Sequence, residues 1–141
     1  MPQINLFLKR IDVNRMLDYG QTPSGGVNAN GNLRVLDVSL LEKGKAHILL
    51  DVIFSMKDLK GKSVMDARLE VGAIYESEEK KVVEMCERWK ENSQVRTDVY
   101  YFVGNTAFRY CVLTLLPVME RMNLPPLIAL PAPIPPPKKT K

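Results

Sequence analysis

The chain has 141 residues, of which 45% are hydrophobic and 26% are charged. These values are typical of one globular domain whose core needs no disulfide or metal support. The formal net charge falls from +4 to +1 when Lys138, Lys139 and Lys141 are left out. A body so close to neutral argues against an extended nucleic-acid-binding surface.

Signals for export, metal binding and catalysis are scarce. The N-terminus lacks a cationic region followed by an apolar core, and no apolar run approaches the ~20 residues that cross a bilayer. Cys86, Cys111 and the single His47 are too few for a structural zinc site. Gly25-Gly26 opens no phosphate-binding loop, because no Lys-Ser or Lys-Thr follows it. We expect a cytoplasmic protein that is not an enzyme and has no cofactor and no metal.

Alternation of apolar and polar residues predicts four strands, over residues 4–17, 33–41, 46–57 and 65–75. Short polar connections follow the second and third strands, so we expect an antiparallel meander. The stretch 19–32 is the exception, because its glycines and asparagines favour turns and it is too long for a tight hairpin. A crossover, a lid and local disorder all remain open for this stretch.

The third and fourth predicted strands each have one apolar face. Alternate residues from Ala46 to Met56 form the first of these faces, and alternate residues from Met65 to Tyr75 form the second. Polar residues occupy the opposite faces. We expect His47 to be solvated, and Arg68 to form an ion-paired stripe with Asp66 and Glu70 along its own strand.

Helical periodicity begins at Ser77, a plausible N-cap, and ends near residues 92–93. A second helix is expected over most of residues 97–122, with a kink or interruption at Pro117. Its apolar surface is broad enough to pack on the sheet and on a partner subunit. Because both helices follow all four strands, the predicted class is α+β, a four-stranded antiparallel sheet with helices packed on one face.

The segment 124–131 is crowded with leucine, isoleucine and proline, so it is expected to lie as an extended apolar ledge. Residues 131–141 contain five prolines, Pro131 included, and end in lysines. We expect polyproline II there and no contribution to the core. The chain therefore divides into a domain over residues 1–130 and a Pro-rich, Lys-terminated tail over residues 131–141.

This arrangement resembles the SecB protein-export chaperones. The long helix of that family opens with a pattern that Asn105, Phe108 and Tyr110 match here. The family's ledge is similar to this chain at Leu124, Pro125, Leu127, Leu130 and Pro131. The resemblance implies a homotetramer, or at least a dimer, that binds unfolded polypeptides in long apolar grooves without ATP, for protein folding and transport.

The resemblance also implies where clients bind. The ledge would form one wall of the groove and the second strand the other, through the residues Leu33, Val35, Leu124, Leu127, Ile128 and Leu130. The family docks on the SecA motor through an acidic surface. Here the matching strand reads Lys-Arg-Ile-Asp-Val-Asn over residues 9–14, and only Glu70 retains a matching carboxylate, which argues against a SecA-type partner.

Two alternative functions stay open. A dedicated partner chaperone or assembly factor would use the same groove for one client. A weak nucleic-acid-binding module would use the terminal lysines instead, although we expect no nucleic-acid partner and no membrane insertion.

Overall fold

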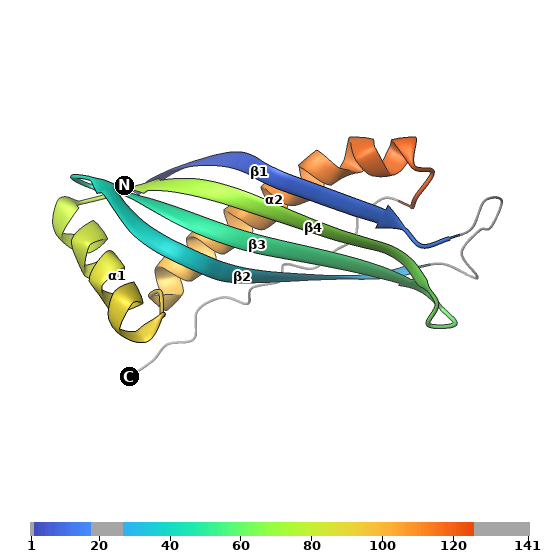
Figure 1. Ribbon diagram of the computed structural model, residues 1–141, viewed down its shortest axis with the longest axis horizontal. Helices are drawn as coiled ribbons and strands as arrows, with labels where there is room; N and C mark the ends of the chain where they lie inside the picture. Colours follow the sequence, from blue (N-terminus) through green and yellow to red (C-terminus); the bar gives the residue numbers. More distant parts are fainter. Residues whose placement is uncertain (1, 18–26, 126–141) are drawn as a thin grey trace.

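A computed structural model describes residues 2–17 and 27–125. Within them the chain forms one sheet and two helices (Figure 1), which confirms the predicted α+β class. The elements are β1 Gln3–Arg15, β2 Val27–Glu42, β3 Lys45–Asp58, β4 Ser63–Glu76, α1 Glu79–Asn92 and α2 Thr97–Arg121. The ledge beyond Pro125 and the tail lie outside the described residues.

The strands are antiparallel and lie in the order β1-β4-β3-β2. β2, β3 and β4 form the predicted meander, but β1 pairs with β4, so the meander does not extend to the first strand. The connection from β1 to β2 therefore passes from one edge of the sheet to the other, in agreement with the crossover interpretation. A period-two pattern shows which residues share a face and carries no information on which strand lies beside it.

Three local features differ from the predictions by more than a shift of one or two residues at a strand end. β2 begins at Val27, six residues before the predicted start. α1 begins at Glu79 after Glu78, which makes no side-chain cap hydrogen bond, so Ser77 is not the N-cap. The Ser77 amide instead donates to the Gly44 carbonyl at 3.0 Å, which ties the start of α1 to the β2–β3 turn. Finally, the α2 helix continues through Pro117 without interruption.

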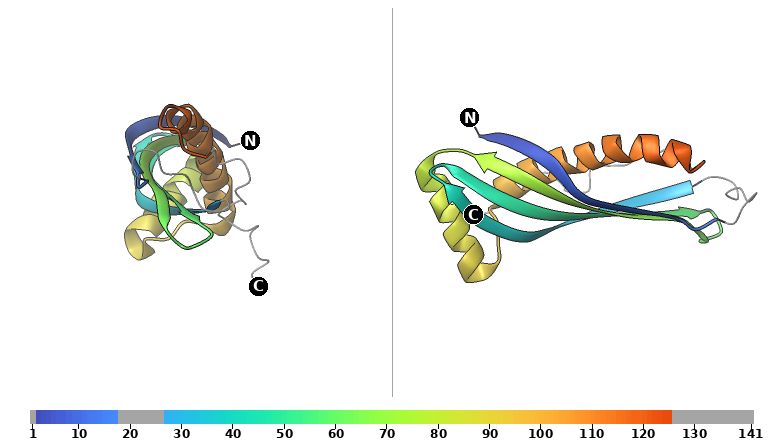
Figure 2. Two further views of the ribbon diagram at one scale, coloured as in Figure 1. Left: turned by 90° about the vertical axis from the view of Figure 1, so that its right-hand side faces the viewer. Right: turned by 45° about the horizontal axis from the view of Figure 1, so that its top comes forward.

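The helices cover the apolar face of the sheet. α2 runs along the sheet and α1 lies at one end of it (Figure 2). The apolar faces predicted for β3 and β4 are buried throughout, from Ala46 to Met56 and from Met65 to Tyr75. α2 has the length and hydropathy of a membrane span. Its residues Val103, Ala107 and Cys111 belong to the buried core, so packing on the sheet accounts for part of that hydropathy.

One close contact joins β2 to α2. Gly31 lies directly beneath the Phe108 ring, and a Cβ at Gly31 would overlap that ring. Phe108 also packs against Phe54 of β3, with ring centroids 4.9 Å apart. The missing side chain at Gly31 therefore lets α2 approach the sheet near its β2 edge.

Gly31→Ala is expected to lower the free energy of unfolding by about 1–3 kcal/mol, because two core rings must shift to admit a methyl group. Gly72→Ala is the matched control. Gly72 also lies beneath a ring, that of Phe7, but this ring is 40% exposed and is free to rotate toward solvent. Urea denaturation of both variants checks the prediction, and an equal loss at the two glycines would contradict it.

Candidate functional site

The predicted groove residues fall into two groups. Leu33 and Leu124 are buried within the core of the chain, and Val35 is half-buried on the helix side of β2. Leu127, Ile128 and Leu130 lie outside the described residues. Because Leu33 and Leu124 are core residues, their side chains are not available to line a groove.

Leu33 and Leu124 lie at opposite ends of α2. The Leu33 carbonyl accepts a hydrogen bond from Tyr100 near the start of the helix, and the Leu124 amide donates to the Met119 carbonyl near its end. Tyr100 and Met119 are nineteen positions apart, which corresponds to about 29 Å of helix. An extended segment of some eight residues has the same length as this part of α2.

β2 is an edge strand, and the hydrogen bonds at Leu33 show which of its backbone groups face outward. The Tyr100 hydroxyl donates to the Leu33 carbonyl at 3.1 Å, and the Leu33 amide donates to the Asn32 side-chain oxygen at 2.9 Å. Neither Leu33 group therefore points to β3. Since outward and inward residues alternate along an antiparallel strand, the groups of Val27, Ala29 and Gly31 also face the open edge.

The outward side of α2 carries both apolar and charged residues. The Thr106 hydroxyl donates to the Phe102 carbonyl at 2.7 Å. Phe102 and Leu113 are 36% and 63% exposed, and a separation of eleven residues places them on one side of a helix. Arg109 and Glu120 are also exposed and lie on the same side of the helix. Phe102 and Leu113 are therefore exposed apolar residues on a surface of mixed character.

The sheet face away from the helices has a charged centre. The Asp51 carboxylate is fully buried between two arginines; the Arg68 Nε donates to Oδ1 at 2.8 Å and the Arg34 Nη2 to Oδ2 at 3.2 Å. The hydrogen bond to Asp51 and its charge raise the pKa of Arg68 above the ordinary value. The predicted stripe along β4 is therefore wrong for Arg68, which pairs across strands, because the pleat places Asp51 beside it on β3.

An aromatic platform lies next to this charged centre. The Phe7 ring covers Gly72 and lies 5.9 Å from the His47 ring, measured between centroids. His47 is half-buried, so the expectation of a solvated side chain is only partly met. With Arg10 opposite Glu70 in the β1–β4 register, the face mixes both signs of charge and is not the acidic surface that the SecB resemblance would require.

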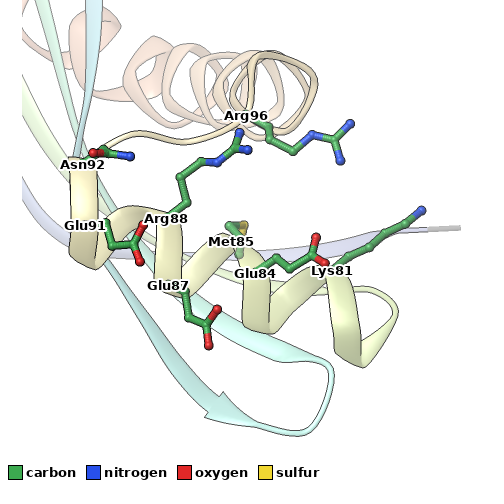
Figure 3. Close-up of a pocket in the computed structure, with 8 residues that line it drawn as sticks. All are labelled: Lys81, Glu84, Met85, Glu87, Arg88, Glu91, Asn92 and Arg96. Atoms are coloured by element: carbon green, nitrogen blue, oxygen red, sulfur yellow. The ribbon is translucent and has the colours of Figure 1, made fainter.

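A hollow of about 430 Å³ lies between α1 and the start of α2 (Figure 3). Three cations and three glutamates line it, together with Met85 and an asparagine; the residues are Lys81, Glu84, Met85, Glu87, Arg88, Glu91, Asn92 and Arg96. Met85 is buried, whereas the others are exposed. Balanced charges on a solvated helix give this hollow no preference for an apolar segment or for an ion of either sign.

The thiols offer no reactive centre. Cys86 and Cys111 are free and buried. Burial raises the pKa of Cys86 above its usual range and the pKa of Cys111 to about 12. Because the thiolate is the reactive form, neither cysteine is poised as a nucleophile. Among the described residues, no group of three or more His, Cys, Asp and Glu side chains is arranged to hold a metal ion.

The predicted site omitted Tyr100 and the edge residues Val27–Gly31. A signal for the edge was present, because residues 27–35 alternate strictly between apolar or small residues and polar ones. The abundance of glycine and asparagine favoured a loop and concealed this period. No sequence signal points to the Tyr100 hydroxyl, since its partner is a backbone carbonyl 67 residues away.

No protein-family model matches the chain, and no curated protein matches it. The fold is similar to a solved structure described as the Mycobacterium tuberculosis Rv1957 SecB-like chaperone in complex with a ChAD peptide from the Rv1956 HigA1 antitoxin. The TM-score is 0.58 at 14% identity, over 89% of this chain and 86% of that one. An antiparallel sheet in the order β1-β4-β3-β2, covered on one face by a long helix, is thus the SecB-like fold.

Proposed function

We propose that this chain is an ATP-independent chaperone that binds unfolded or non-native polypeptides along α2 and the β2 edge. The observation that carries the proposal is the β2 edge itself. Outward backbone groups lie there beside an apolar helix in a SecB-like fold. An extended segment gains main-chain hydrogen bonds from such an edge, which require no particular sequence. Apolar burial then adds roughly 25 cal/mol per Å².

The proposal includes a homo-oligomer, a dimer or tetramer located in the cytoplasm. The exposed side chains of Phe102 and Leu113 on one side of α2 support a contact between copies. No catalytic residue, cofactor or nucleic-acid partner is assigned. A role in protein export through a SecA-type motor is not part of the proposal, because the outer sheet face carries Arg34 and Arg68 around Asp51.

A dedicated client is the second candidate. The similar structure holds a peptide from a single antitoxin, and a groove of the same kind here would serve one partner equally well. Copurification from the native host separates the candidates, because a general chaperone captures many chains and a dedicated one captures one.

Aggregation of a heat-unfolded protein such as citrate synthase tests the proposal by light scattering. The wild-type chain is expected to suppress aggregation without ATP. The double variant Leu127→Ser, Leu130→Ser should need at least about tenfold more protein for equal suppression, since it removes two apolar contacts. The oligomer mass should be unchanged.

An exposed leucine away from the proposed groove provides the control. Leu59 lies in the β3–β4 turn and is exposed, so Leu59→Ser should suppress aggregation as well as the wild type. Equal suppression by the groove variant would contradict the assignment of the ledge. Loss of folding in that variant would show that Leu127 and Leu130 belong to the core.

A further inference from the structure

Only a short part of the β2 edge has unpaired outward backbone groups among the described residues, because side chains of the same chain occupy the groups of Leu33. Both outward groups of Leu33 are occupied, the carbonyl by Tyr100 and the amide by Asn32. No described residue bonds to the outward groups of Val27, Ala29 and Gly31. Beyond Leu33 only Val35 continues the regular edge, since the β2–β3 register shifts between Val35 and Asp37. A bulge of this kind interrupts the alternation of backbone groups.

We propose that Tyr100 and Asn32 determine where a bound client strand ends, so that a client pairs with Val27–Gly31 and is excluded from Leu33 onward. This inference rests on the proposed chaperone function and deepens it. Without the two hydrogen bonds at Leu33 the edge available to a client would extend to Val35. The Tyr100 hydroxyl thus acts as a plug, in the sense that it occupies the Leu33 carbonyl that a client strand would otherwise bind. The chaperone, and not the client, then sets the length of the paired segment.

The occupant that fits this edge is an extended polypeptide segment with alternating apolar and polar residues. Val27, Ala29 and Gly31 are small residues on the helix side, where Gly31 lies beneath Phe108, whereas Asn28, Asn30 and Asn32 lie on the other face. An added strand continues both faces of the sheet. Its apolar side chains would therefore lie on the Phe108 side and its polar side chains beside the asparagines.

The state of the Tyr100 hydroxyl supports a permanent plug. The side chain is half-buried against the core, and this burial raises the pKa of Tyr100 above its ordinary value. The hydroxyl consequently remains protonated, and able to donate to Leu33, throughout the neutral pH range.

Two N-methylated peptides test the pairing. The probe is a fluorescein-labelled ten-residue peptide of alternating valine and threonine with lysine at each end. One derivative carries N-methyl groups on the four valines and the other on the four threonines. In a paired strand, only one of these sets faces β2. Fluorescence anisotropy should show about tenfold or weaker binding for one derivative and nearly unchanged binding for the other. Equal affinity of the two derivatives would overturn the pairing.

Tyr100→Phe tests the plug. The ring remains and the hydroxyl is lost, so the Leu33 carbonyl becomes available to the peptide. The unmethylated peptide should bind about three- to tenfold more tightly, the value of one further hydrogen bond. Tyr101→Phe is the matched control, since Tyr101 is a neighbouring half-buried tyrosine on α2. Unchanged affinity of Tyr100→Phe, or an equal gain in both variants, would overturn the plug.

These outcomes are distinct from failure of the proposed function. If the wild-type chain captures unfolded citrate synthase but the two methylated peptides bind equally, clients are held without strand pairing and the inference falls alone. If neither the unmethylated peptide nor unfolded citrate synthase is bound, the chaperone proposal falls and the inference with it.

Discussion

Replacing Phe108 with alanine is expected to lower the free energy of unfolding by about 3–5 kcal/mol, the usual cost of deleting a buried aromatic ring. The ring is almost fully buried, packs on Phe54 and covers Gly31. Because Gly31 has no side chain, nothing from β2 can fill the space that the ring leaves. Urea denaturation followed by circular dichroism measures the loss.

Phe102→Ala is the matched control for Phe108. Phe102 lies on the same helix and meets Tyr75 edge-on, with centroids 6.4 Å apart, but it is 36% exposed. Its loss should cost about 1 kcal/mol, the value of one aromatic pair at the surface. Equal destabilisation by the two changes would show that Phe108 is not the contact that joins α2 to β2.

Leu113→Glu is expected to weaken the proposed homo-oligomer by about a hundredfold or more in dissociation constant. Burying an unpaired carboxylate in an apolar contact costs several kcal/mol, and each 1.4 kcal/mol is about tenfold. Because Leu113 is 63% exposed, the folded monomer should tolerate the change. Light scattering at micromolar concentration should give a mass above 16.0 kDa for the wild type and a lower mass for the variant.

Lys80→Glu introduces a carboxylate on α1, where Lys80 is exposed, and provides the control. This variant should keep the wild-type mass, since the change lies in the first turn of α1 and not on α2. A wild-type chain that is monomeric at micromolar concentration would contradict the interpretation of the exposed α2 side.

The alternation of apolar and polar residues predicts best those strands that have one buried and one exposed face. β3 and β4 bury every second residue, so their sequences predicted both the strands and the core face. β1 and β2 lie at the edges, and there the pattern is weaker. β2 was shortened in the prediction because Gly31 and the asparagines beside it resemble a turn, although Gly31 is required by the approach of Phe108.

The candidate site was less predictable than the fold, because it consists largely of backbone N–H and C=O groups, which every residue carries. Side-chain patterns indicated apolar residues such as Leu33, which the structure places in the core. The outward carbonyl of Leu33 and its contact with Tyr100 depend on which strand lies at the sheet edge and on where α2 begins. Neither is a local property of the sequence.

The most direct test of the proposed function is binding to a permanently unfolded protein. Reduced and carboxymethylated α-lactalbumin has no stable fold, whereas the native, disulfide-bonded form does. The chaperone proposal predicts that the wild-type chain binds the unfolded form with a Kd in the micromolar range or tighter, equally well with and without ATP, and does not bind the native form. No binding to the unfolded form, or equal binding to both forms, would contradict it.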